Sequence, residues 1–177
     1  MIDITNGVRD LFVPRPRKVG RIRVSDAYGI VEGYITPQNF LVPEIPSPEA
    51  CIRMFKGTVI HDIVEKVLKE EGWQTEVSCE RDFGDFLLVG RVDAVKDGTL
   101  LELKTNDVEL ATAKPGQAYQ MRMYLSLLEI EEGIVGQPII KGDQIIIKQL
   151  RKSKRNDEWF MKQIELLDRF HSLLPKP

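Results

Sequence analysis

Two carboxylates and a lysine fall on one face of a predicted hairpin near the middle of the chain. Apolar residues run up to an Asp-Gly pair at residues 97–98 and resume after it, which predicts two strands joined by a tight two-residue turn. With that turn, Asp93 lies directly opposite Glu102, where Cβ atoms are roughly 4.5–5.5 Å apart and like charges repel. Lys104 comes two residues after Glu102 and therefore projects from the same face.

This trio has the chemistry of a divalent-cation site. Carboxylates supply the hard oxygen ligands that Mg²⁺ and Mn²⁺ prefer, and such an ion can activate a water molecule and polarise a phosphodiester. A lysine on the same strand could orient or deprotonate the attacking water, or stabilise charge that develops on phosphorus. The alternative is an exposed face on which Arg91 and Lys104 offset Asp93 and Glu102, and the hairpin alone does not decide between the two. A one-residue slip of the strands would also move Asp93 to the other face.

A long helix is predicted ahead of the hairpin. Ser47 is suited to cap its start and Gly72 to end it, and apolar residues recur between them at helical spacing. His61 lies on the flank of that apolar stripe, with Glu65 one turn after it and Gly57 one turn before it. The missing side chain of Gly57 would let another element approach the imidazole closely. Taken alone, His61 is more typical of a histidine at the edge of a core than of a ligand.

The remaining elements surround this pair. Strands are predicted at 75–80, 86–95, 100–105 and 143–150, and helices at 117–131 and 156–174. The order α-β-β-β-α-β-α indicates an α/β (α+β) fold in which helices flank a mixed central sheet. The apolar face of the hairpin, expected to pack on a helix, consists of Val92, Ala94, Leu101 and Leu103.

Two further expectations concern the ends of the chain. Three consecutive isoleucines at 145–147 predict a strand buried on both faces, preceded by a loop over about 132–142. The first 46 residues are punctuated by proline and glycine, so we expect an N-terminal arm at 1–46 and one domain at 47–177.

Composition limits the class of protein. The chain has 177 residues, 42% hydrophobic, with a formal net charge of -2, which suits one soluble globular domain. It shows no apolar run long enough for a membrane span and no signal-peptide pattern, so an intracellular, cytoplasmic location is expected. Cys51 and Cys79 are too few for a cysteine-only zinc or iron–sulfur site, and they leave open either a buried free pair or a disulfide.

Basic residues gather in two places. One cluster spans residues 15–23, and the other consists of Arg151, Lys152, Lys154 and Arg155. Such clusters are usually solvated surface, and the near-neutral net charge does not by itself indicate a nucleic-acid binder. They gain significance only if the chain has a site that handles phosphate.

Four short motifs occur in order along the chain. They are His61 on a helix, Gly-x-x-Asp at 90–93 on a strand, Glu-x-Lys at 102–104 on the next strand, and Gln-x-x-x-Tyr at 120–124 on a helix. In this order the chain resembles the RecB-type branch of the PD-(D/E)XK nucleases, which includes the CRISPR-associated RecB-like exonucleases. The resemblance covers about residues 55–128 and implies a restriction-endonuclease-like core. Each motif is weak alone, whereas all four on the expected elements are quite specific.

The resemblance implies roles for these residues. The implied ligands of Mg²⁺ or Mn²⁺ are His61, Asp93, Glu102 and the backbone carbonyl of Leu103. Lys104 is implied as the catalytic lysine, acting together with the acidic pair.

DNA contacts are implied as well. Gln120 and Tyr124 lie one turn apart and are expected to line the site and contact the DNA strand, together with Arg91. A helix face partly buried under the sheet is the alternative for Tyr124. Gln117 and Tyr119 offer a competing pairing that is out of phase with the motif. We also expect the cluster of Arg151, Lys152, Lys154 and Arg155 to form a basic loop that contacts phosphates, as does the basic arm at 15–23.

The chain departs from the family pattern at two points. Val92 stands where the nominal motif has proline, which is common in the RecB-type branch. More importantly, no cysteine follows Cys79, whereas the CRISPR-associated members hold an iron–sulfur cluster with cysteines near the C-terminus. No iron–sulfur cluster is therefore expected here, and a place in CRISPR adaptation does not follow from the resemblance.

The sequence thus indicates a metal-dependent deoxyribonuclease, with exonuclease action on single strands or DNA ends preferred. Two alternatives keep the fold: a structure-selective endonuclease of the junction-resolvase kind, and a non-catalytic DNA-binding subunit. A metal-binding structural domain is a third. DNA is the expected partner, no membrane association is expected, and the oligomeric state stays open, a homodimer included.

Overall fold

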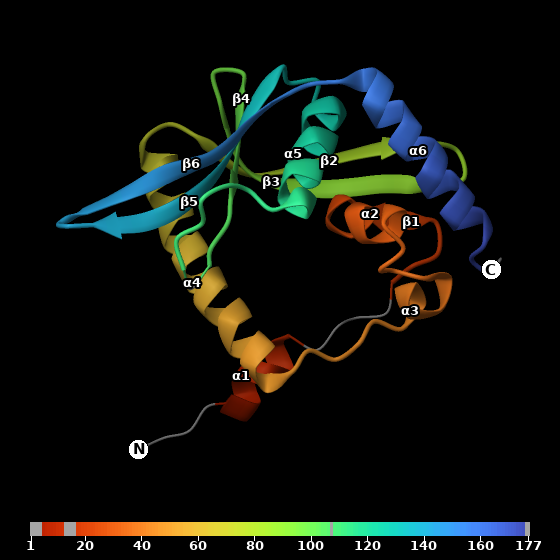
Figure 1. The fold of residues 1–177 in the computed structure, drawn as a ribbon, viewed down its shortest axis with the longest axis horizontal. Helices are drawn as coiled ribbons and strands as arrows, with labels where there is room; N and C mark the ends of the chain where they lie inside the picture. Colours follow the sequence, from red (N-terminus) through yellow and green to blue (C-terminus); the bar gives the residue numbers. More distant parts are fainter. Residues whose placement is uncertain (1–4, 13–16, 107, 176–177) are drawn as a thin grey trace.

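The computed structural model describes residues 5–12, 17–106 and 108–175. Its strands form one twisted sheet, and its helices lie around that sheet (Figure 1). In chain order the elements are α1 (Thr5–Leu11), β1 (Arg21–Arg23), α2 (Val24–Val31), α3 (Pro37–Leu41), α4 (Pro48–Glu70), β2 (Gln74–Asp82), β3 (Leu87–Lys96), β4 (Thr99–Leu103), α5 (Pro115–Leu127), β5 (Glu132–Lys141), β6 (Gln144–Lys154) and α6 (Asp157–Ser172).

The sheet is mixed, as the sequence predicted. Its strand order is β1-β3-β4-β5-β6, with β2 paired to β3 as well. The β1–β3 and β4–β5 pairs are parallel and the others antiparallel. Along one edge of β3 runs β2, while the other edge is shared by β1 at its start and β4 at its end. Residues 90–93 therefore lie between these two partners, at a gap in the strand pairing of that edge.

Helices cover both faces of the sheet. On one face α2, α5 and α6 pack together over the larger core. Its fully buried side chains include Ile22, Leu88, Leu100, Met121, Leu125, Phe160 and Leu167. On the other face α4 contributes Leu68 to a smaller cluster with Leu101 and Leu103. Leu100 and Leu101 belong to different clusters because successive residues of a strand point to opposite faces.

The N-terminal region differs from the expected arm over residues 1–46. Its strand β1 joins the sheet beside β3, and α2 packs on α5 and α6. Ile22, Val24 and Phe40 are buried in the larger core. The described part of residues 17–46 is thus integral to the domain, because its apolar side chains complete the core under α6. Arg15 lies outside the described residues.

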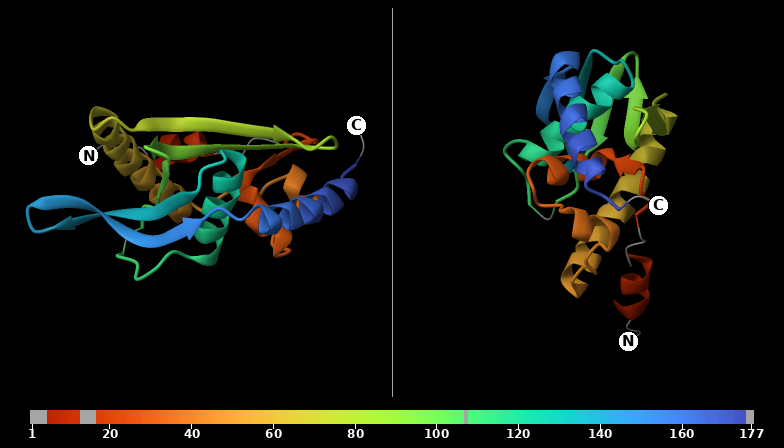
Figure 2. Two further views of the ribbon diagram at one scale, coloured as in Figure 1. Left: turned by 90° about the horizontal axis from the view of Figure 1, so that it is seen from above. Right: turned by 90° about the vertical axis from the view of Figure 1, so that its right-hand side faces the viewer.

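The β5–β6 hairpin corrects two expectations. Residues predicted as a loop form β5, and the hairpin projects from the body of the molecule (Figure 2). Ile140 and Ile145 are 80% and 71% exposed, so the prediction of a strand buried on both faces was wrong. The β-branched residues form strands because the two strands pair with each other along their length, including the tip that extends past the helices (Figure 2).

The ends of α4 and α6 lie close to where the sequence placed them, whereas α5 ends at Leu127, four residues before its predicted end. The Ser47 side chain accepts a hydrogen bond from the Ala50 backbone at the start of α4, and Gly72 follows its end with a φ of 83°. Asn156 caps α6, whose Phe160, Ile164, Leu167 and Phe170 are buried. The apolar stripe of α4 is instead mostly exposed along both halves of the helix, from Ile52 to Val67.

Two remaining points concern cysteines and membranes. Cys51 and Cys79 are both buried and free, which settles the alternatives in favour of two thiols. Within the described parts of the chain, no helix combines the length and apolarity that crossing a bilayer requires.

Candidate functional site

The predicted hairpin is present in the predicted register. Ala94 pairs with Leu101 and Lys96 with Thr99, and the turn between them has positive φ at both residues, 49° and 72°. Continuing this register sets Asp93 across from Glu102. There the strands are linked through a side chain, since the Leu103 amide donates a 2.6 Å hydrogen bond to Asp93 Oδ2.

The backbone around Asp93 is irregular. Across from it on β2, Glu76 adopts a φ of 53°, a left-handed conformation that is uncommon for residues other than glycine. Val92 packs in the larger core, whereas Ala94 packs with Leu101 on the α4 side, although residues two apart share a face in a regular strand. The expected apolar face therefore loses Val92. Such irregularities re-aim side chains beside functional sites.

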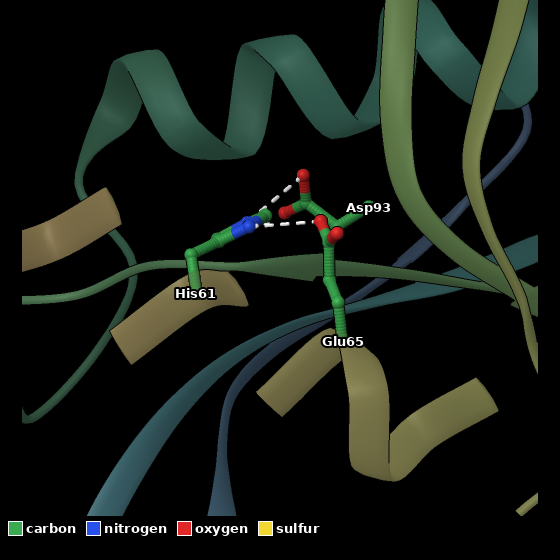
Figure 3. A group of neighbouring side chains, drawn as sticks. All are labelled: His61, Glu65 and Asp93. Carbon is green, nitrogen blue, oxygen red and sulfur yellow. Dashed lines mark ion pairs between the residues drawn. The ribbon is translucent and has the colours of Figure 1, made fainter. Parts of the chain in front are cut away.

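Helix α4 brings His61 to this point. Its Nε2 lies 3.1 Å from Asp93 Oδ1 and its Nδ1 lies 2.8 Å from Glu65 Oε1 (Figure 3). Gly57 leaves room for the chain after β4, because a Cβ there would come within 2.7 Å of the Thr105 hydroxyl oxygen. Hydrogen bonding to Asp93 raises the pKa of His61 above its usual value, against the opposing effect of burial.

Glu102 is the most deeply buried acidic group of the site, with 3% of its side chain exposed. Its Oε1 accepts a 2.7 Å hydrogen bond from Lys104 Nζ, while its buried Oε2 has no hydrogen-bond partner among the described residues. Burial raises the pKa of Glu102 to about 7, an effect that Lys104 opposes and Asp93 reinforces. An unpartnered buried carboxylate oxygen is costly unless a cation or proton neutralises it.

A hydrogen-bonded chain leads from Lys104 to α5. Lys104 Nζ donates to Gln120 Oε1 at 3.1 Å, and Gln120 Nε2 donates to the Tyr124 hydroxyl oxygen at 3.2 Å. Tyr124 is only 3% exposed, so the structure favours its packing role over the expected contact with DNA. Gly90 accommodates it, because a Cβ at that position would overlap the Tyr124 ring.

The competing pair on α5 lies elsewhere. Gln117 accepts a 2.8 Å hydrogen bond from the Lys114 backbone amide at the start of the helix. Tyr119 is buried, and its hydroxyl donates to Gln163 of α6 at 3.3 Å. Neither residue reaches Lys104, which leaves Gln120 as the glutamine of the site.

The donor set fits a hard divalent cation. Ligand atoms of His61, Glu65 and Asp93 lie within 4.8 Å of one another. The 3.1 Å between His61 Nε2 and Asp93 Oδ1 also matches the ~3 Å between neighbouring ligands of an octahedral ion with bonds of ~2.1 Å. Glu102, an expected ligand, is outside this tight group, but it lines the same cleft as His61 and Asp93 and keeps Oε2 without a partner among the described residues. Glu65 was not expected as a site residue.

His61, Asp93, Glu102 and Lys104 line a cleft of about 1160 Å³. The cleft runs from Asp93 and Glu102 along the first half of α4 and under the loop that follows β4. Its walls carry the cations Arg53, Lys56, Arg91 and Lys114 and the apolar side chains Phe12, Phe55, Val59 and Val108. Of the cations, only Arg91 was expected to contact DNA. A sequence signal did exist, since Arg53 lies eight residues, about two helical turns, before His61.

The late basic cluster lies away from this cleft. Its residues belong to β6 and its end rather than to a loop, because β6 extends to Lys154. They pair with nearby acids: Lys152 with Glu132 at 2.8 Å, and Arg155 with Asp157 at 2.7 Å. Among the residues that line the cleft, none belongs to the cluster of Arg151, Lys152, Lys154 and Arg155. This end of β6 pairs with the start of β5, whereas the Lys104 backbone amide bonds to Gly136, nearer the middle of β5.

No family model matches the chain, and no curated protein matches its sequence. Among solved structures, SSO0001 is similar with a TM-score of 0.61 and 20% identity, over 98% of this chain and 86% of that one. The alkaline exonuclease LHK-Exo from Laribacter hongkongensis matches with a TM-score of 0.63 and 14% identity, over 94% and 91%.

A phage-related exonuclease from Haemophilus somnus 129PT matches with a TM-score of 0.56 and 12% identity, over 94% of this chain and 96% of that one. LHK-Exo in complex with dAMP matches with a TM-score of 0.64 and 16% identity, over 87% of each chain. At these identities the likeness concerns the fold. The chain therefore has the mixed α/β, restriction-endonuclease-like fold of these exonucleases.

Proposed function

We propose that the chain is a Mg²⁺- or Mn²⁺-dependent deoxyribonuclease of the RecB-type branch of the PD-(D/E)XK superfamily. The observation that carries this proposal is the Glu102 carboxylate, which lines one cleft with His61, Asp93 and Lys104 and has a buried oxygen, Oε2, without a partner among the described residues. The fold supports it, since LHK-Exo and the phage protein are named exonucleases and one of these structures contains dAMP.

In this proposal the ion is held by His61, Asp93, Glu102 and the backbone carbonyl of Leu103. When bound, it supplies an activated water and neutralises charge on the scissile phosphate. Lys104 is held between Glu102 and Gln120 at 2.7 and 3.1 Å, so its ammonium group is fixed beside the ligands. From there it orients the attacking water and stabilises the charge that develops on the phosphate oxygens.

The cleft supports single-stranded DNA, or the unpaired end of a duplex, as the substrate. Its walls combine Arg53, Lys56 and Lys114 with apolar side chains such as Phe55 and Val108. A single strand presents phosphates and base faces together, and proteins bind it with cations and apolar or aromatic surfaces at once. In a duplex the base faces are stacked on one another, so they cannot contact the apolar wall of the cleft.

The late basic cluster remains a predicted second contact with phosphates, outside the cleft. Because Lys152 and Arg155 already pair with acidic side chains, we expect it to contribute less than the cleft cations. Action on DNA also agrees with the expected intracellular location.

The decisive experiment is digestion of end-labelled single- and double-stranded DNA with Mn²⁺, with and without a chelator. Chelation is expected to abolish cleavage, and Lys104→Ala to keep DNA binding while losing turnover by about 10² or more. Lys162→Ala serves as the matched control, because that lysine lies exposed on α6 and pairs with Glu158. Full cleavage by Lys104→Ala would refute the assignment.

A covalently closed single-stranded circle separates exonuclease from endonuclease action. We expect linear strands to be shortened and closed circles to survive. Cutting of circles or of four-way junctions would favour the junction-resolvase alternative. DNA binding without cleavage of any substrate would favour the non-catalytic subunit, which the complete set of Asp93, Glu102 and Lys104 makes the weaker candidate.

A further inference from the structure

We propose that Glu65 is a positioning residue, which holds the His61 ring so that Nε2 faces Asp93 and the metal site. The inference rests on the proposed function, because it gives Glu65 a role toward the metal ligands of that site. None of the sequence motifs includes Glu65. The structure alone places its carboxylate against the far nitrogen of the ring (Figure 3).

The two carboxylates approach different nitrogens of the same imidazole. Glu65 follows His61 by four residues, so both side chains leave α4 on one face. Glu65 Oε1 lies 2.8 Å from Nδ1, whereas Asp93 Oδ1 lies 3.1 Å from Nε2. With a carboxylate at Nδ1, the neutral ring keeps its proton on that nitrogen and leaves the lone pair of Nε2 for an ion.

The same arrangement recurs at the other two proposed side-chain ligands. Asp93 has Oδ2 tied to the Leu103 amide at 2.6 Å, which leaves Oδ1 facing the site. Glu102 has Oε1 tied to Lys104 at 2.7 Å, which leaves Oε2 without a partner. Each ligand thus has one polar atom held by the protein and the other available. Glu65 completes this pattern for His61.

Glu65 has no competing partner in the described parts of the chain. Its Oε1 is buried, and no donor is aligned with it. The 2.8 Å contact between His61 Nδ1 and Glu65 Oε1 is thus an ion-pair contact that does not meet the geometry of a hydrogen bond. Arg91, whose charge also acts on Glu65, is paired with Glu76 at 2.8 Å. The contacts of Glu65 therefore indicate that it supports His61.

The test is Mn²⁺ binding to the full chain without DNA, measured by isothermal titration calorimetry. Glu65→Ala removes the support and is expected to weaken Mn²⁺ binding about 10- to 100-fold, the range found for such outer partners. Glu65→Gln keeps a carbonyl oxygen for Nδ1–H and the shape of the side chain, so we expect a loss of about threefold or less. Glu70→Gln, an exposed glutamate on the same helix, is the matched control and should bind Mn²⁺ as the parent does.

Two results would overturn the inference. Wild-type Mn²⁺ affinity in Glu65→Ala would show that His61 needs no support. An equal loss in Glu65→Gln and Glu65→Ala would show that the negative charge matters, as for a direct ligand. A positioning role also predicts that excess Mn²⁺ restores cleavage by Glu65→Ala, with kcat little changed, and a kcat that stays low at saturating Mn²⁺ would argue against it.

His61→Ala separates this inference from the proposed function. Weak Mn²⁺ binding by His61→Ala with normal binding by Glu65→Ala would overturn the role of Glu65 alone. Normal binding by His61→Ala and Asp93→Asn would overturn the metal site itself, and the inference with it. In the His61→Ala background, adding Glu65→Ala should cause no further loss. An additional loss there would mean that Glu65 acts independently of the ring.

Discussion

Replacing Gly90 by alanine tests how closely β3 packs against α5. An alanine Cβ would overlap Cε1 of Tyr124 and would lie 3.1 Å from Val24 Cγ2 and 3.3 Å from Cys79 Sγ. All three neighbours are buried, so none can swing into solvent. The Tyr124 ring would have to retreat by about 1 Å to restore an ordinary carbon–carbon contact of ~3.5 Å.

Both stability and turnover should fall. Adding a methyl group to a filled core costs about 1–3 kcal/mol, which for a chain of this size lowers Tm by about 3–10 °C. Tyr124 also bonds Gln120 at 3.2 Å, and Gln120 holds Lys104. A shift of about 1 Å passed along this chain can cost up to ~10² in turnover.

Thermal unfolding followed by circular dichroism and initial rates on end-labelled single strands measure the two effects. Gly7→Ala is the matched control, because a Cβ there meets no atom within 4 Å and alanine suits the helix α1. In a Tyr124→Ala background, Gly90→Ala should cost less stability than in the parent, with a coupling of about 1–3 kcal/mol. A Tm for Gly90→Ala within about 1 °C of the parent, with full turnover, would refute the reasoning.

Three other outcomes are expected. Folding raises the pKa of both His61 and Glu102, so each group takes up protons when the chain folds. Their contribution to the free energy of unfolding is therefore full at low pH and is lost as the pH rises. For Glu102 the loss occurs between pH 4.5 and about 7. Denaturant unfolding of the metal-free chain should show this loss, and Glu102→Gln should reduce it, whereas an unchanged slope would contradict the assignment. Mn²⁺ affinity should rise over pH 6–8, because the ligands must lose protons to bind, and a flat calorimetric profile would count against the site. The double variant Arg53→Ala, Lys56→Ala should bind single strands more weakly. The slope of log binding constant against log salt concentration should fall in magnitude by about 0.7 for each phosphate that these two side chains neutralise. An unaltered slope would show that neither side chain contacts the DNA.

Local sequence chemistry was sufficient for the hairpin and the helix ends. The turn at residues 97–98 needs positive φ at two positions, which aspartate and glycine accept, and it sets the register of Asp93 and Glu102. Ser47 and Asn156 satisfy backbone amides within three residues of themselves. These features depend only on neighbours along the chain, so they could be predicted.

Strand partners and exposure could not be predicted in the same way. The three residues of β1 pair with β3 more than sixty positions away, and nothing in their own pattern indicates a strand. Ile140 and Ile145 have the side chains of a buried strand, yet they are exposed because no helix reaches the hairpin tip. Periodicity indicates which residues share a face, but not what covers that face.

The sequence by itself determined the type and order of the candidate site residues: a histidine, the carboxylates Asp93 and Glu102, and Lys104. Only the tertiary structure decided that Glu65 joins them and that Tyr124 is buried behind Gln120. The physical reason is that spacing along one helix or strand specifies a direction, whereas contact between elements depends on how closely they pack. Here that packing is set by the absent side chains of glycines in α4 and β3, at the points where the elements meet.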